Sequence, residues 1–239
     1  MKKNLKLIAL LAGAVLTIGS LTACGNSDKQ ESSETENIKT SETTVDTADW
    51  SLPTELTENL FDYQFQAGGS VLSSPITLRH LKEAGWKSDE SKHTAFNPDA
   101  EYALDFEKDG VKISVLAKNN TADTVNDRLS DEGSALIDVE NISCFSKLNT
   151  EPIVLPKNIA ANMSTKDDLV SAYGEPNERE DQFAPNGGSL TGYVYYYWED
   201  TSKTSHKDVS RYIGITVEKN DDGKFVVVGV TLHNDKDER

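Results

Sequence analysis

The chain has 239 residues, of which 36% are hydrophobic and 27% charged, and its formal net charge is −16. This composition is typical of a globular protein with one or two domains. Such an acidic chain lacks the clustered basic residues that bind phosphates, so we expect no nucleic-acid partner and no electrostatic docking on anionic lipid.

The first 23 residues have the layout of a secretory signal peptide. Lys2, Lys3 and Lys6 precede an uncharged apolar run from Leu7 to Gly19. About 13 residues cover only about 20 Å as a helix, which is less than the roughly 30 Å of a bilayer core. We therefore predict a targeting segment over residues 1–23 that is removed, and not a permanent membrane span.

The stretch Leu21-Thr22-Ala23-Cys24 follows the apolar run. It resembles the lipobox of bacterial lipoproteins. The resemblance implies that Cys24 receives a diacylglyceryl group and becomes the first residue of the mature protein. Two acyl chains anchor a protein stably. The expected partner of Cys24 is thus the lipid bilayer, with the protein on the extracytoplasmic face of the cell membrane.

A polar segment over residues 24–49 follows the lipobox. From Gly25 to Asp49, nine of 25 residues are Ser or Thr and seven are acidic. Such a segment buries too little apolar surface to offset the entropy lost on ordering. We predict a disordered tether that acts as a spacer, with recognition by the tether as the alternative.

Residues 50–148 are predicted to form a first domain of strands and one short helix. Alternating apolar residues and Gly-containing turns indicate hairpins, and apolar residues at helical spacing indicate the helix. The predicted elements are a hairpin over 61–72, a helix over 77–84 ended by Gly85, a hairpin over 101–119 and a strand over 134–145.

Residues 149–239 are predicted to form a second domain. Ser164 or Thr165 can cap a short helix, which Gly174 ends and Pro176 prevents from resuming. Three strands are expected after it, over 192–200, 211–219 and 225–234, the last two joined by a hairpin turn.

This second half resembles a family of small envelope proteins. The segment NMSTKDDLVSAYGEP resembles the GMTKEEVxxxLGxP motif of BamE/SmpA-like assembly factors and of the repeats of beta-lactamase inhibitory protein, over roughly residues 153–234. The matching residues are Met163, Thr165, Leu169, Gly174 and Pro176, whereas Asn162 replaces the usual Gly.

Thr77, Leu81 and Gly85 of the first half match the motif more weakly. The segment LRHLKEAGWK also resembles uncharacterised lipoproteins of low-GC Gram-positive bacteria. The resemblances imply an α+β fold with two tandem domains, each with short helices packed on an antiparallel sheet. They also imply an interaction role.

The sequence contains no recognisable catalytic or metal-binding motif. The four histidines, His80, His93, His206 and His233, lack metal-ligand spacing, and no nucleophile motif or phosphate-binding loop is present. Cys144 has apolar flanks and is expected to be an ordinary buried thiol. We therefore predict no catalytic residue, no metal and no cofactor.

In a strand, the stretch GYVYYYWED places Tyr193, Tyr195 and Tyr197 on one face and Val194, Tyr196 and Trp198 on the other, so both faces carry aromatic residues. We expect Tyr193, Tyr195, Tyr197 and Tyr212 to form an outward patch, since Tyr is favoured at binding surfaces. The alternative is that this face packs on the first half of the chain.

These observations predict a non-catalytic protein-binding module whose partner is a protein of unknown identity. Envelope maintenance or inhibition of an enzyme are the roles that the resemblance implies. The alternative is a module that binds a small ligand or a cell-wall component. An enzyme is the least favoured class.

Overall fold

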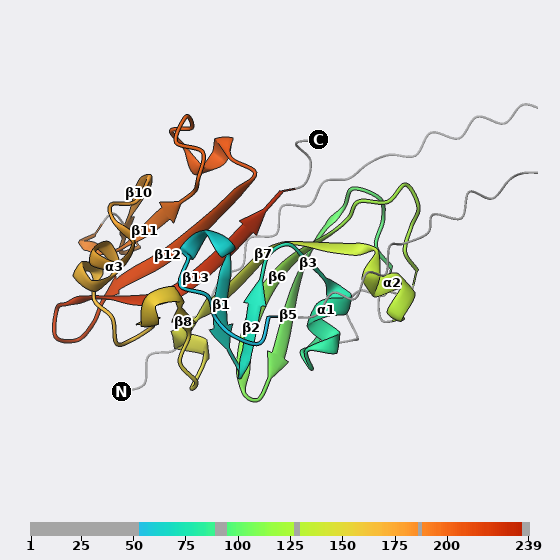
Figure 1. Cartoon of the computed structure of the whole chain (residues 1–239), viewed down its shortest axis with the longest axis horizontal. Helices are drawn as coiled ribbons and strands as arrows, with labels where there is room; N and C mark the ends of the chain where they lie inside the picture. Colours follow the sequence, from blue (N-terminus) through green and yellow to red (C-terminus); the bar gives the residue numbers. More distant parts are fainter. Residues whose placement is uncertain (1–52, 89–94, 127–129, 186–187, 236–239) are drawn as a thin grey trace, which may run out of the picture. The chain divides into compact units, whose positions relative to one another are not determined.

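The computed structural model describes residues 53–88, 95–126, 130–185 and 188–235. All of them belong to one compact unit. Within these residues, strands predominate and form two antiparallel sheets, accompanied by three short α-helices (Figure 1).

The larger sheet has nine strands in the order β10-β11-β12-β13-β7-β6-β5-β4, and β3 pairs with β7 off this path. Every pairing in this sheet is antiparallel. Its strands are β3 (Ile76–Thr77), β4 (Lys87–Ser88), β5 (Glu101–Lys108), β6 (Val111–Asn119), β7 (Ile137–Phe145), β10 (Glu178–Phe183), β11 (Leu190–Tyr197), β12 (Arg211–Lys219) and β13 (Phe225–Asn234).

The smaller sheet has four strands in the order β2-β1-β8-β9. They are β1 (Gln64–Ala67), β2 (Ser70–Ser73), β8 (Val154–Leu155) and β9 (Ile159–Ala160). The helices are α1 (Leu78–Glu83), α2 (Asp131–Ala135) and α3 (Lys166–Tyr173), with 3-10 turns η1 (Leu60–Asp62), η2 (Ser146–Leu148), η3 (Pro156–Asn158) and η4 (His206–Asp208).

The prediction of an α+β fold with two tandem helix-on-sheet domains is wrong. Strand β13 of the second half pairs with β7 of the first half, and Figure 1 shows the two lying side by side. Cys144 and Val230 are cross-strand partners, and both are fully buried. Each strand has a buried apolar face and an edge free for pairing, so joining them extends one sheet and one core across both halves.

The core is a single cluster of buried apolar side chains drawn from both sheets. Phe65 and Leu72 enter it from the smaller sheet, and Ile113 and Ile215 from the larger one. The smaller sheet also joins the halves, because Gln66 of β1 pairs with Val154 of β8. These contacts leave no boundary near residue 148 that would separate two cores.

The predicted helix of the second half is confirmed as α3. Thr165 caps it: its hydroxyl accepts a hydrogen bond from the Asp168 backbone N–H, while Asp168 Oδ2 accepts one from the Thr165 backbone N–H at 2.8 Å. This reciprocal arrangement satisfies N–H groups that a helix start leaves unpaired. Gly174 ends the helix with φ of +82°, a conformation that favours glycine. α3 then packs on β9 and β13.

Candidate functional site

The four predicted tyrosines do not share one outward face. The ladder between β11 and β12 pairs Tyr195 with Ile215 and Tyr197 with Ile213, so these tyrosines face the core. Tyr195 is 4% exposed and Tyr197 is 2% exposed. Tyr212 precedes Ile213 and therefore lies on the opposite face of the sheet. The prediction of a single outward tyrosine patch is wrong. The face of β11 that carries Tyr195 and Tyr197 was expected to be exposed, but it is buried.

The core-facing tyrosines hold α3 against the sheet. The ring of Tyr197 meets that of Tyr173 edge-on with centroids 6.0 Å apart, and its hydroxyl donates to the Gly174 carbonyl at 3.3 Å. The hydroxyl of Tyr173 donates to the Pro156 carbonyl. Burial raises the pKa of both phenols well above the ordinary value. These tyrosines therefore have a structural role.

A groove of about 800 Å³ lies between α3 and β10. One wall comes from α3, the other from β10 and the segment before it, and Tyr195 of β11 also lines it. The lining residues are Lys166, Asp167, Val170, Ser171, Glu175, Pro176, Asn177, Glu178, Arg179 and Tyr195. Tyr195 is thus the one member of the predicted patch that lines this groove, through its small exposed fraction.

Strand β10 borders this groove and ends the larger sheet. Among the described residues it pairs with β11 alone, so its other edge has no strand partner. An edge strand carries unpaired backbone N–H and C=O groups along its free side. Phe183 ends β10 with 59% of its surface exposed. The groove and the free edge together form the candidate binding site.

On its groove face, β10 carries one cation that is already paired. Arg179 Nε lies 3.1 Å from Asp181 Oδ1, and the Arg179 guanidinium lies 5.0 Å from the centre of the Tyr193 ring. Tyr193 in turn stacks on Tyr195 with an interplanar angle of 3°. The Arg179 side chain is therefore held along the sheet by an ion pair and a cation–π contact.

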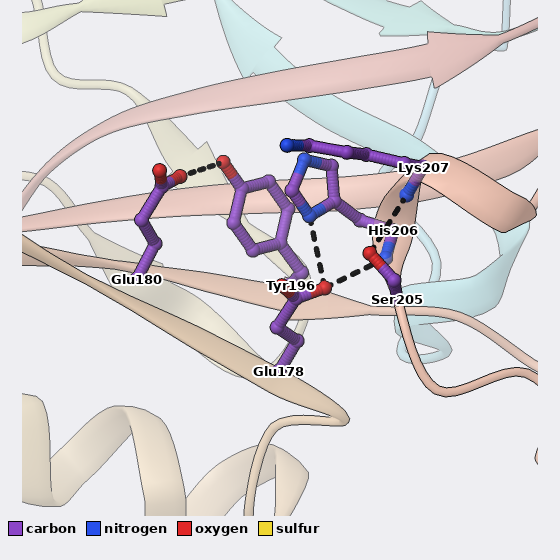
Figure 2. A network of polar contacts seen from close by, with 6 residues as sticks. All are labelled: Glu178, Glu180, Tyr196, Ser205, His206 and Lys207. Atoms are coloured by element: carbon purple, nitrogen blue, oxygen red, sulfur yellow. Dashed lines mark hydrogen bonds and ion pairs between the residues drawn. The ribbon is translucent and has the colours of Figure 1, made fainter.

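Glu180, and Glu178 at the start of β10 where it also borders the groove, lie on the opposite face of the strand and are fixed by groups from other elements (Figure 2). Glu178 Oε2 accepts a hydrogen bond from the His206 backbone N–H at 2.7 Å and lies 2.9 Å from His206 Nδ1. Glu180 Oε2 accepts one from the Tyr196 hydroxyl at 3.0 Å. The His206 ring stacks on the Tyr196 ring with centroids 3.9 Å apart. The network ties β10 to β11 and η4.

The charge of Glu178 is favoured by these contacts. Partial burial on its own would raise the pKa of the carboxyl group, but the hydrogen bonds from the His206 backbone and ring outweigh it and hold the pKa below its usual range. For Tyr196, burial together with the bond to Glu180 raises the phenol pKa. Glu178 therefore stays ionised and Tyr196 stays a donor at neutral pH.

The aromatic contacts continue across the same face. Tyr212 meets Tyr196 and His206 edge-on, and it stacks on His233 with centroids 4.5 Å apart. His233 Nδ1 lies 2.9 Å from Asn141 Oδ1 of β7. Burial lowers the pKa of His233, so its ring is neutral at pH 7. These stacked rings therefore pack on the face of β11, β12 and β13 that lies opposite the core.

Other predicted features have different outcomes. Cys24, the signal peptide of residues 1–23 and the tether of residues 24–49 lie outside the described residues. Cys144 is confirmed as a buried free thiol, and burial raises its pKa to about 12. In the part of the chain that the structure describes, no helix has the length and hydrophobicity to cross a bilayer. Nor do three metal-ligating side chains gather anywhere in those described ranges.

The sequence does not predict strand β10. Its sequence, EREDQF, has no apolar alternation and no β-branched residue. The one available signal was its position before the aromatic strand β11, with which it pairs.

No family model matches the chain, and no curated protein or solved structure matches it significantly. The resemblances to envelope lipoproteins therefore depend on their motif residues alone.

Proposed function

We propose that this chain is a lipid-anchored, extracytoplasmic lipoprotein whose folded part is a non-catalytic protein-binding module. The observation that carries the proposal is the free edge of β10 beside the groove under α3. A free strand edge presents alternating backbone donors and acceptors, which match another polypeptide backbone better than they match a small molecule. The anchor at Cys24 would keep this surface near the membrane.

The anchor is supported by the lipobox Leu21–Cys24 and by its place after a short apolar run. Two acyl chains on Cys24 supply the pair of signals that stable membrane attachment requires. The acidic protein is repelled by anionic headgroups, so the lipid would hold it at the surface without docking its folded part there. The β10 edge would then remain accessible to a partner.

Site-specific photo-crosslinking in whole cells that produce the full chain tests this proposal. A photoreactive phenylalanine analogue replaces Phe183 at the end of β10, and the control places it at Leu148 in η2, which is equally exposed at 59%. We expect a protein adduct at 183 and none at 148. The proposal fails if position 183 gives no protein adduct, if both positions crosslink alike, or if the adduct is dissolved by enzymes that cleave cell-wall glycan.

A further inference from the structure

We propose that β10 receives an extended segment of its protein partner, rich in Lys or Arg, as an additional strand of the larger sheet. This inference rests on the proposed function and names the chemistry of the partner. It is argued from the geometry of the edge, from its charge and from the way its side chains are held.

The geometry of the edge suits a strand. β10 has six residues, and its residues from Arg179 to Asp181 are exposed. A strand paired at its free edge would lie about 4.8 Å away, with alternate side chains toward each face of the sheet. On one face those side chains would enter the groove opposite Val170 and Ser171 of α3. On the other face they would pass Glu178 and Glu180.

The charge of the edge selects a basic partner. β10 carries three acidic side chains against one basic one, Arg179, and that one is paired with Asp181. Glu180 accepts a hydrogen bond from the uncharged Tyr196 hydroxyl, and the contacts of Glu178 favour its ionised form, so both carboxylates bring negative charge to the face of the sheet opposite the core. Opposite charges across a strand pair attract and like charges repel. A second copy of this chain would bring the same acidic edge and is disfavoured.

The edge is pre-organised for pairing. The His206 contacts and the Tyr196 hydroxyl fix the two glutamate side chains before any partner binds (Figure 2). Fixed side chains lose less conformational entropy on binding, which strengthens association. At the end of β10, exposed Phe183 offers an apolar contact. Together these features favour a segment in which basic and apolar residues alternate.

Titration of the full chain in neutral detergent with a labelled, capped hexapeptide of alternating Lys and Val tests the inference. We measure binding by fluorescence anisotropy and expect it to be saturable. Glu180→Gln keeps an acceptor for Tyr196 but removes the charge, and should weaken binding up to about fivefold. Glu180→Lys should weaken it by about tenfold or more. Asp221→Lys makes the same charge change in the exposed turn before β13 and should leave binding unchanged.

Backbone pairing is tested with two further peptides, N-methylated either on every Lys or on every Val. In an added strand only alternate N–H groups face β10, so one peptide should lose binding and the other should keep it. The inference is overturned if both peptides bind, if Asp221→Lys weakens binding as Glu180→Lys does, or if the chain dimerises through β10. If position 183 crosslinks a protein in cells but the hexapeptide does not bind, this inference fails while the proposed function stands.

Discussion

Replacing Gly229 by Ala tests whether β13 and β7 form one sheet. Gly229 faces Phe145 across the two strands. A Cβ atom at 229 would lie 2.3 Å from Phe145 Cδ1 and 3.1 Å from the Cys144 carbonyl oxygen, whereas contacting carbons lie about 3.5–4.0 Å apart. The phenyl ring would have to move from its place on the sheet.

Overpacking of this kind destabilises a protein by about 1–3 kcal/mol. For a unit of this size we expect Gly229→Ala to lower Tm by roughly 2–4 °C per kcal/mol, as followed by calorimetry or circular dichroism. Phe145→Ala removes the ring that the new methyl group meets. In that background Gly229→Ala should therefore lose most of its effect, with a coupling free energy of about 1–2 kcal/mol.

The double-mutant cycle separates this contact from a general effect of either substitution. If the two changes add within about 0.5 kcal/mol, Gly229 and Phe145 are not neighbours. The pairing of β7 with β13 would then be wrong, and two separate domains would return as the better description.

Three further predictions follow from the buried tyrosine, the open face and the anchor. Tyr195→Ala should destabilise the fold by about 3–5 kcal/mol in urea unfolding, because it empties a buried aromatic site; an unchanged midpoint would mean that Tyr195 is exposed. His233 has a lowered folded-state pKa, so its contribution to stability is complete above about pH 6.5 and falls as pH decreases through that lowered pKa. His233→Gln should therefore show a smaller loss of urea midpoint between pH 7.5 and pH 5 than the wild type; equal losses would contradict this. Cys24→Ser should abolish labelling by radioactive palmitate and release the chain from membranes, and retained label would refute lipidation.

Local signals were sufficient for some elements. The helix α3 follows from Thr165 as cap and Gly174 as stop, and both act within a few residues of the helix. The turn at Asp109-Gly110 likewise determines the hairpin of β5 and β6, because glycine at φ of +78° suits it. These predictions depend on short-range physics that a sequence displays directly.

The site depends on longer-range physics. The two faces of β11 are both aromatic, so the pattern does not say which face is buried until the register with Ile213 and Ile215 of β12 is known. β10 is a strand because its backbone pairs with β11, and its glutamates find partners on η4 and β11 that are distant in the sequence. The pairing of β7 with β13 joins segments more than 80 residues apart, and no local period encodes it.

Amide hydrogen exchange over residues 178–183 tests the central claim most directly. The full chain would be measured with and without the alternating Lys-Val hexapeptide. The free edge of β10 predicts that alternate amides of this strand exchange rapidly alone and become protected when the peptide binds. Protection confined to the open face around Tyr212 and His233, with β10 unchanged, would contradict the claim.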